Sequence, residues 1–173
     1  LRRLRKKWTV NTEEEALLGV SLTGIMDNAF MNGNNKGVAV CEWNSGKLSL
    51  PDFLLSLKKE AVKVNKEWAS LLGINPATSI TAIKPSGTVS QLVDSASGIH
   101  PRHNDYYLRR VRADVKDPIA QLMKDEGVPC EPDVMKPESV EIFTFPMKAP
   151  EGAVLRDDKT AIEQLELWLI YQT

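Results

Sequence analysis

The stretch Ser79-Ile-Thr-Ala-Ile-Lys-Pro-Ser-Gly-Thr-Val-Ser-Gln-Leu92 decides how this chain folds. The alternating β-branched residues of 79–83 predict a short strand, and segment 88–93 predicts a helix that follows it. Pro85 ends the strand, and Gly87 allows a tight turn with no side chain in the way. A strand, a turn and a helix in this order are typical of an α/β architecture.

Further strands and helices alternate on both sides of this stretch. Strands are predicted at about 18–24, 106–112 and 140–145, and helices at 51–72, 117–127 and from Thr160 onward. Because the two kinds of element interleave, the sequence predicts an α/β fold with parallel strands. No clear linker divides the chain, so residues 1–173 are expected to belong to one domain.

Local signals mark the ends of the predicted helices. Pro51 and Gly73 bracket a stripe of apolar residues spaced three to four apart, which we expect to lie in the core. Asp117 starts another helix, because it is a good N-cap followed by proline. The inward face of that helix is expected to consist of Ile119, Leu122 and Met123.

The two ends of the chain carry capping-box spacings and charge. Thr160 with Glu163 opens the last helix. Thr12 with Glu15 has the same spacing, but the glycines that follow favour the strand at 18–24 over a helix there. The basic cluster at 1–8, which ends in Trp8, is interpreted as the solvated end of a cut helix, with a nucleic-acid-binding arm as the alternative.

Length and composition limit the function classes. With 173 residues, 42% hydrophobic residues and a net charge of -1, the chain lacks the basic character of a general nucleic-acid binder. Its two cysteines, Cys41 and Cys130, are too few for a disulfide scaffold, so a reducing, cytoplasmic setting is expected. No apolar run is long enough to predict a membrane span. The chain begins without Met and ends at Thr173 within an amphipathic pattern, so we expect a piece of a longer protein.

The turn that follows the strand at 79–83 carries the clearest chemistry. Backbone amides at a glycine turn before a helix, together with hydroxyl groups, bind anions, and phosphate is the commonest occupant. The candidate residues are Pro85, Ser86, Gly87, Thr88 and Val89. An ordinary strand-to-helix turn in which Ser86 and Thr88 only cap the helix accounts for the same residues.

Other candidate groups offer less. The loop that contains His100 and Arg102 could present both side chains to an anion, or could be a surface turn with a hydrogen-bonded histidine. Asp94 and Asp105 flank this loop and are interpreted as turn formers. Cys41, beside Glu42, and Cys130 are interpreted as structural, because no cation nearby would lower a thiol pKa. We therefore predict no metal ligands and no catalytic residues in this chain.

Four separated blocks together resemble the catalytic chain of ribonucleotide reductases, in particular the monomeric, adenosylcobalamin-dependent ribonucleoside-triphosphate reductases (class II). The blocks are Leu18-Gly-Val-Ser-Leu-Thr-Gly-Ile-Met-Asp27, Ile83-Lys-Pro-Ser-Gly-Thr-Val-Ser-Gln-Leu92, Ser97-Gly-Ile-His-Pro-Arg102 and Tyr106-Tyr-Leu-Arg-Arg-Val-Arg112. The resemblance implies that the chain is a partial slice of a ten-stranded α/β barrel. It also implies that segment 85–89 is the loop that binds the substrate phosphates.

The same resemblance implies the chemistry of the whole enzyme. A ribonucleoside triphosphate is reduced to a deoxyribonucleotide by a thiyl radical generated with adenosylcobalamin, a thioredoxin-type reductant supplies electrons, and a deoxynucleotide acts as allosteric effector. The radical cysteine, its carboxylate and the reducing cysteine pair are expected outside residues 1–173, because Cys41-Glu42 has the wrong spacing and place. The alternative is an α/β module that binds a phosphorylated metabolite and catalyses nothing.

Overall fold

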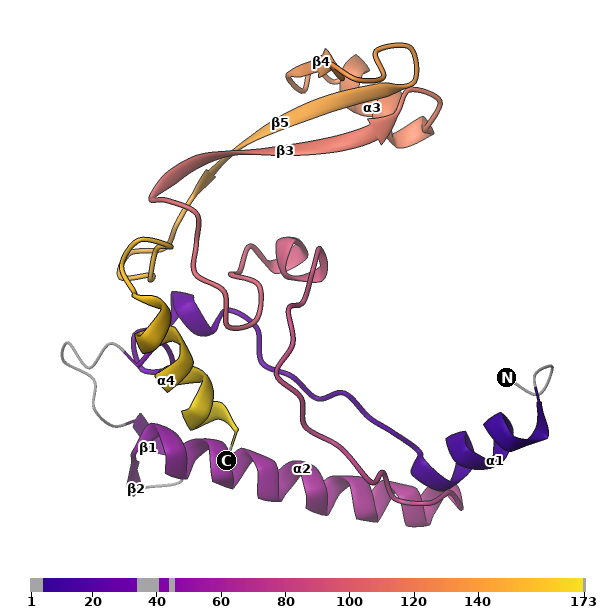
Figure 1. The fold of residues 1–173 in the computed structure, drawn as a ribbon, viewed down its shortest axis with the longest axis vertical. Coiled ribbons are helices and arrows are strands. Elements are labelled where there is room, and N and C mark those ends of the chain that lie inside the picture. Colours follow the sequence, from indigo (N-terminus) through magenta and orange to yellow (C-terminus); the bar gives the residue numbers. More distant parts are fainter. Residues whose placement is uncertain (1–4, 34–40, 44–45, 173) are drawn as a thin grey trace. The chain divides into compact units, whose positions relative to one another are not determined.

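The computed structural model describes residues 5–33, 41–43 and 46–172, with only the backbone described for 41–43. Two compact units form: one comprises Leu1–Arg102 and Glu151–Thr173, and the other His103–Pro150. Figure 1 shows the elements of each unit in chain order. Because the second unit is inserted between two parts of the first, this division is compatible with one domain over 1–173, which stays a prediction.

The first unit is mostly helical. Its elements are the helices α1 (Lys6–Glu15), α2 (Leu50–Leu72) and α4 (Ala161–Tyr171), the 3-10 helices η1 (Ile25–Asp27) and η2 (Val89–Val93), and the hairpin strands β1 (Cys41–Trp43) and β2 (Gly46–Leu48). A small core joins η1, the loop before Arg102, the segment before α4, the start of α2 and the middle of α4. Its buried members are Met26, Leu50, Ala96, Val154 and Leu167.

Helix α2 begins and ends where the sequence predicts. The Ser49 hydroxyl accepts a hydrogen bond from the amide of Asp52, Pro51 lies in the first turn, and Gly73 takes the left-handed conformation at φ 65°. The expectation that its apolar stripe is core is wrong for the second half, where Trp68 is 59% and Leu71 76% exposed. In this half of the helix Ala69 is buried, so the spacing identifies the apolar face but not how little of it is covered.

The segments predicted as strands at 18–24 and 79–83 run parallel to each other in Figure 1. The amide of Leu18 donates to the Ser79 carbonyl at 3.2 Å, and that of Val20 to the Ile80 carbonyl at 2.9 Å. Only one pair, Val20 and Thr81, forms a parallel bridge, so the pairing is shorter than predicted. This pairing brings the start of the phosphate-turn candidate beside segment 18–24.

Helix α1, which precedes segment 18–24, contains Thr12 and Glu15, the pair with capping-box spacing. Thr12 lies inside the helix, and its hydroxyl donates to the Trp8 carbonyl at 2.7 Å. The helix ends at Glu15, with Ala16 left-handed at φ 43°. The spacing of Thr12 and Glu15 is therefore that of two helical neighbours one turn apart, and it marks no helix start.

The second unit is a three-stranded sheet with one helix. The strands β3 (Tyr106–Asp114), β5 (Val140–Lys148) and β4 (Cys130–Pro132) lie in the order β3-β5-β4, and α3 (Pro118–Asp125) connects β3 to β4. The strands predicted at 106–112 and 140–145 are confirmed, but every pair in this sheet is antiparallel. The prediction of parallel strands is thus wrong here: α3 and β4 lie between β3 and β5 in the chain, but this connection does not return the chain to the edge where β3 begins, so β5 runs in the opposite direction.

Helix α3 starts as predicted, since the Asp117 carboxylate accepts from the amide of Ile119 at 2.9 Å. Its inward face is different from the prediction: Ile119 is 65% exposed, whereas Ala120 is buried. Lys124, one turn after Ala120, donates to Glu141 of β5 at 2.6 Å. Of the three residues predicted to face inward, Ile119 and Leu122 are therefore exposed and Met123 is half-buried, whereas a small residue and a lysine contact the sheet.

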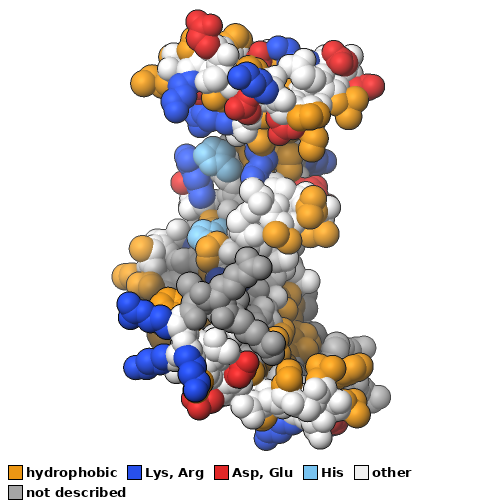
Figure 2. All heavy atoms as spheres, turned by 90° about the vertical axis from the view of Figure 1, so that its right-hand side faces the viewer, with side chains coloured by type: hydrophobic (Ala, Val, Ile, Leu, Met, Phe, Trp, Pro, Cys, Tyr) orange, Lys and Arg blue, Asp and Glu red, His pale blue; other side chains and the backbone are white. Residues whose placement is uncertain are grey.

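Both units carry hydrophobic side chains on their surfaces (Figure 2). None of the helices within the described ranges combines the length and apolar character needed to cross a membrane.

Candidate functional site

The candidate turn is a compact reversal of the chain at 86–89. The amide of Val89 donates to the Ser86 carbonyl at 3.2 Å, and Gly87 lies in the left-handed region at φ 61°. A Cβ built on Gly87 would meet no atom within 4 Å, and Gly87, Thr88 and Val89 are all exposed. The outer face of the turn is therefore open to a ligand.

The helix that follows is weaker than the sequence predicts. It is a 3-10 helix of five residues, η2, and Thr88 at its N-cap makes no side-chain capping bond. The Ser90 hydroxyl donates to the Gly87 carbonyl at 3.3 Å and holds the turn closed. So short a helix has little dipole, so any anion affinity depends on the turn itself.

The amides of the turn divide into two kinds. That of Val89 is occupied by the Ser86 carbonyl, so it is not available in the way the sequence suggested. Within the described ranges, no hydrogen bond engages the amides of Gly87 and Thr88. Two adjacent amides and the Thr88 hydroxyl are thus the donors that an anion would find.

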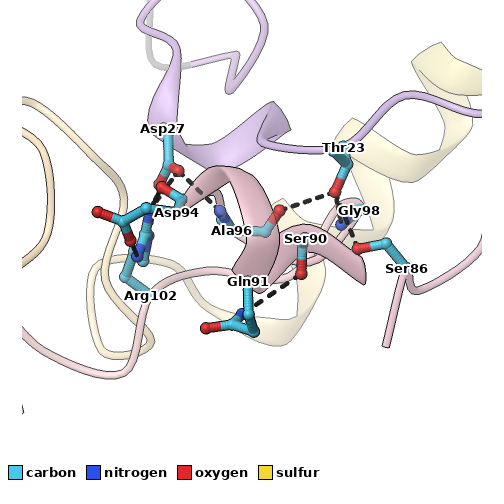
Figure 3. A network of polar contacts seen from close by, with 9 residues as sticks. All are labelled: Thr23, Asp27, Ser86, Ser90, Gln91, Asp94, Ala96, Gly98 and Arg102. Atoms are coloured by element: carbon cyan, nitrogen blue, oxygen red, sulfur yellow. Dashed lines mark hydrogen bonds and ion pairs between the residues drawn. The ribbon is translucent and has the colours of Figure 1, made fainter. Parts of the chain in front are cut away.

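Ser86 is turned toward the rest of the unit. Its hydroxyl lies 2.9 Å from Oγ1 of Thr23 in segment 18–24 (Figure 3). It also lies 3.2 Å from Oγ of Ser97 in the loop after η2. The Thr23 hydroxyl also lies 3.0 Å from the Ala96 carbonyl, to which it donates, and 3.0 Å from the Gly98 amide, from which it accepts. Three segments distant in sequence therefore meet at two hydroxyl groups.

The loop 95–98 packs directly against the chain before the turn. Gly98 is left-handed at φ 57°, and a Cβ there would lie 2.5 Å from the Lys84 carbonyl oxygen. The amide of Gly24 donates to the Ala96 carbonyl at 2.8 Å, and that of Ile25 to the Gly98 carbonyl at 3.2 Å. Only glycine fits at position 98, so this loop and the turn are in fixed contact.

A buried ion pair between Arg102 and Asp27 anchors the loop 95–98. The Arg102 side chain is 2% exposed, and its Nε and Nη2 donate to the two carboxylate oxygens of Asp27 at 2.9 and 2.8 Å. Its Nη1 also donates to Asp94 at 3.1 Å, and Asp27 accepts from the amide of Ala96 at 2.7 Å (Figure 3). The guanidinium faces carboxylates inside the unit, so the idea that Arg102 presents itself to an anion ligand is wrong.

The remaining candidates lie apart from the turn or serve structure. His100 is exposed, and its Nδ1 lies 2.9 Å from the Ser97 carbonyl, as a hydrogen-bonded surface histidine would. Asp94 is left-handed at φ 44° and ends η2, and Asp105 begins the segment that leads into β3. Cys130 is a half-buried free cysteine at the start of β4. The backbone of Cys41 lies in β1, and its side chain is outside the described part.

Sequence reasoning missed three polar groups that shape the site: Thr23, Asp27 and Ser97. All three lie in blocks that had been singled out, but their spacing carries no signal of contact, because Thr23 and Asp27 bond to partners 63 to 75 residues away. The available hint was a threonine at the end of a predicted strand and an aspartate shortly after it.

Comparison with known proteins supports the resemblance seen in the sequence. No family model matches the chain. Adenosylcobalamin-dependent ribonucleoside-triphosphate reductases of Lactobacillus acidophilus and Lactobacillus gasseri are 30% and 33% identical to it over 144 residues, which is 76% of this chain and 19% of each relative. The enzyme of Lactobacillus leichmannii is 26% identical over 160 residues, 82% of this chain and 21% of its own.

A solved structure gives the same answer for the fold. The crystal structure of a B12-dependent (class II) ribonucleotide reductase aligns with 95% of this chain and 25% of its own, with a TM-score of 0.73 and 23% identity. This likeness confirms the predicted fold class, an α/β slice of the reductase fold. The chain spans about a fifth of the length of the relatives that it matches. By sequence and by fold, it belongs to the family of adenosylcobalamin-dependent ribonucleoside-triphosphate reductases.

Proposed function

We propose that this chain supplies the substrate-phosphate turn of a ribonucleoside-triphosphate reductase, formed by Pro85, Ser86, Gly87, Thr88 and Val89. The observation that carries the proposal is the open left-handed turn at Gly87, with two adjacent amides that no described group engages. Amides fixed in a turn bind phosphate oxygens without needing a charged side chain. Lys84, exposed just before the turn, adds a positive charge near it.

Holding the triphosphate would place the ribose for reaction. Fixing one end of a substrate removes part of the entropy cost of bringing its reacting atoms together. The turn suits this task because it is anchored by the Ser86 hydroxyl and by the close contact of Gly98 with Lys84. In this proposal the chain binds and orients the nucleotide, and the radical chemistry takes place on residues outside 1–173.

The intact enzyme would use adenosylcobalamin as its radical source, a thioredoxin-type reductant and a deoxynucleotide effector. The groups around the turn do not fit the cofactor itself, because they are amides and hydroxyls suited to an anion. In the described part of the chain, no group of three His, Cys, Asp or Glu side chains is placed to hold a metal ion. We therefore assign no cofactor residue here and derive no step through the cobalamin.

Gly87→Ala tests the proposal in the intact reductase. The added methyl group would project into open space, where a phosphate oxygen must approach the amides. We expect the KM for the ribonucleoside triphosphate to rise roughly tenfold, with a smaller change in kcat, since about one hydrogen bond to a charged group is lost. Steady-state kinetics measure both constants.

Gly73→Ala is the matched control. Gly73 is left-handed at φ 65° and also has no atom within 4 Å of a built Cβ, so both variants carry the same backbone strain, about 1 kcal/mol. Gly73 ends α2, away from the turn, and its variant should keep the KM of the wild type. Equal KM values for the two variants would contradict the role of the turn in binding the substrate phosphates. The alternative function, a non-catalytic module that binds a phosphorylated metabolite, would then be tested by measuring the binding of other phosphorylated ligands.

A further inference from the structure

We infer that Thr23 is a positioning residue for the phosphate turn: its hydroxyl holds Ser86 inward, so that ligand contact falls to Gly87 and Thr88. This inference rests on the proposed function of the turn and deepens it. It assigns a role to Thr23, for which neither the spacing of the motif nor the comparisons give one.

The Thr23 hydroxyl is fully used by protein groups. A hydroxyl offers one proton and two lone pairs. In Thr23 the proton goes to the Ala96 carbonyl at 3.0 Å, one lone pair accepts from the Gly98 amide at 3.0 Å, and the other faces Ser86 Oγ at 2.9 Å. Although Thr23 is exposed, its oxygen therefore has no capacity left for a ligand, and its effect on binding must pass through its partners.

The consequence for Ser86 is that its proton also points inward. Because Thr23 donates its proton to the Ala96 carbonyl, Ser86 must be the donor in any hydrogen bond between the two hydroxyl groups. The single proton of Ser86 goes either to Thr23 Oγ1 at 2.9 Å or to Ser97 Oγ at 3.2 Å. In either arrangement the hydroxyl of Ser86 acts as an anchor of the turn. The Gly87 and Thr88 amides, next along the chain, then have no hydrogen-bond partner among the described residues.

Thr23 is itself held by its neighbours along the chain. The amides of Gly24 and Ile25 donate to the carbonyls of Ala96 and Gly98, which flank the hydroxyl contact. Four residues after Thr23, Asp27 is fixed by the guanidinium of Arg102. A rigid backbone on both sides lets one hydroxyl determine where Ser86 lies, and Figure 3 shows Thr23 above Ser86 in this arrangement.

Thr23→Val tests the inference in the intact reductase, because valine keeps the shape and removes the hydroxyl. The measurement is the competitive inhibition constant of inorganic triphosphate against the nucleotide substrate, which reports on the phosphate site alone. We expect Thr23→Val to raise this constant about tenfold, and Thr23→Ser, which restores the hydroxyl, to stay within about threefold of the wild type. A loss of folded enzyme would lower the apparent kcat but would not move an inhibition constant.

Thr78→Val is the matched control. Thr78 is also exposed in the first unit, and its hydroxyl donates to the distant Glu15 carbonyl at 3.3 Å, away from the turn. Thr78→Val should leave the inhibition constant of inorganic triphosphate unchanged. If Thr23→Val does not give folded enzyme, Ser97→Ala, which removes only the other contact of Ser86, replaces it, and it too must raise the constant.

The outcomes separate this inference from the function on which it rests. If Gly87→Ala raises the inhibition constant and Thr23→Val does not, the positioning role is wrong and the phosphate turn stands. If inorganic triphosphate does not compete with substrate, or if neither variant changes its constant, the proposed function fails and this inference fails with it.

Discussion

The two units of this chain hold their shape by different means. In the second unit, β3 and β5 pair continuously over nine residues, from Tyr106 opposite Lys148 to Asp114 opposite Val140. In the first unit, the segments around the candidate turn pair at a single bridge, Val20 with Thr81. A continuous ladder of backbone bonds holds the second unit, whereas scattered backbone bonds and a few side chains hold these segments of the first.

This difference decides how each unit should respond to mutation. A ladder distributes its stability over many equivalent bonds, so the loss of one side chain changes little. A network built on one buried guanidinium and two hydroxyl groups concentrates its stability, and the loss of one member leaves buried partners unpaired. Sites that need an irregular backbone, such as a phosphate turn, depend on the second kind of structure.

The largest effect is expected for Arg102→Met. It leaves the Asp27 carboxylate, whose side chain is 13% exposed, without the two hydrogen bonds that compensate its burial. We expect a loss of about 3–5 kcal/mol in the free energy of unfolding, measured by urea denaturation.

Arg112→Met in the second unit is the control for this loss. Arg112 also pairs with an aspartate, Asp133, at 2.7 Å, but its side chain is 73% exposed. The Asp133 side chain is only 6% exposed, but it keeps the hydrogen bonds from the amides of Met135 and Lys136, so the replacement should cost about 1 kcal/mol, less than Arg102→Met. Equal losses from the two arginine variants would contradict the contrast between the units.

A smaller difference is expected between two left-handed glycines. Gly98→Ala forces a Cβ to within 2.5 Å of the Lys84 carbonyl, and backbone cannot move aside as a flexible side chain would. We expect it to cost about 3 kcal/mol in urea denaturation, the sum of strain and overpacking. Gly127→Ala, at φ 76° with open space around it in the second unit, should cost about 1 kcal/mol. If the two variants lose the same free energy of unfolding, the contact between Gly98 and Lys84 can relax, and it does not hold the turn in place.

The sequence predicted what local signals can specify. Pro51 and Gly73 mark α2 because proline and glycine act on their own turn of backbone, and Thr160 with Glu163 forms a reciprocal capping box in the structure. The turn at Gly87 was predicted for the same reason. These signals involve residues within a few positions of each other.

Contacts between distant segments were not predictable. The sequence left open whether Arg102 faces an anion ligand or lies in a surface turn, and in the structure it pairs with the carboxylate of Asp27, 75 residues away. Periodicity identified the apolar face of α2 but not what would cover it, so Trp68 is exposed where core was expected. The antiparallel order of β3, β5 and β4 likewise depends on which strands meet, and the alternation of strands and helices does not determine that.

The smallest effects concern two carboxylates that each unit stabilises locally. The side-chain hydrogen bond from Arg112, with backbone amides of Met135 and Lys136, lowers the pKa of Asp133 below its ordinary value. In the first unit, the Thr160 amide and hydroxyl lower the pKa of Glu163. Because both folded pKa values lie below the unfolded ones, each contribution to stability is complete above the ordinary carboxyl pKa and is lost as the pH falls through the lowered value.

Arg112→Met should therefore raise the pKa of Asp133 toward its ordinary value and leave that of Glu163 where it is, as measured by NMR titration of the carboxyl carbons. Arg112 is the largest cause of the shift, but two amides still donate to Asp133, so part of the lowering should persist. An unchanged Asp133 titration would mean that the backbone alone holds this carboxylate. Backbone amides would then stabilise the charge of Asp133 in the second unit, whereas the Arg102 side chain stabilises the charge of Asp27 in the first.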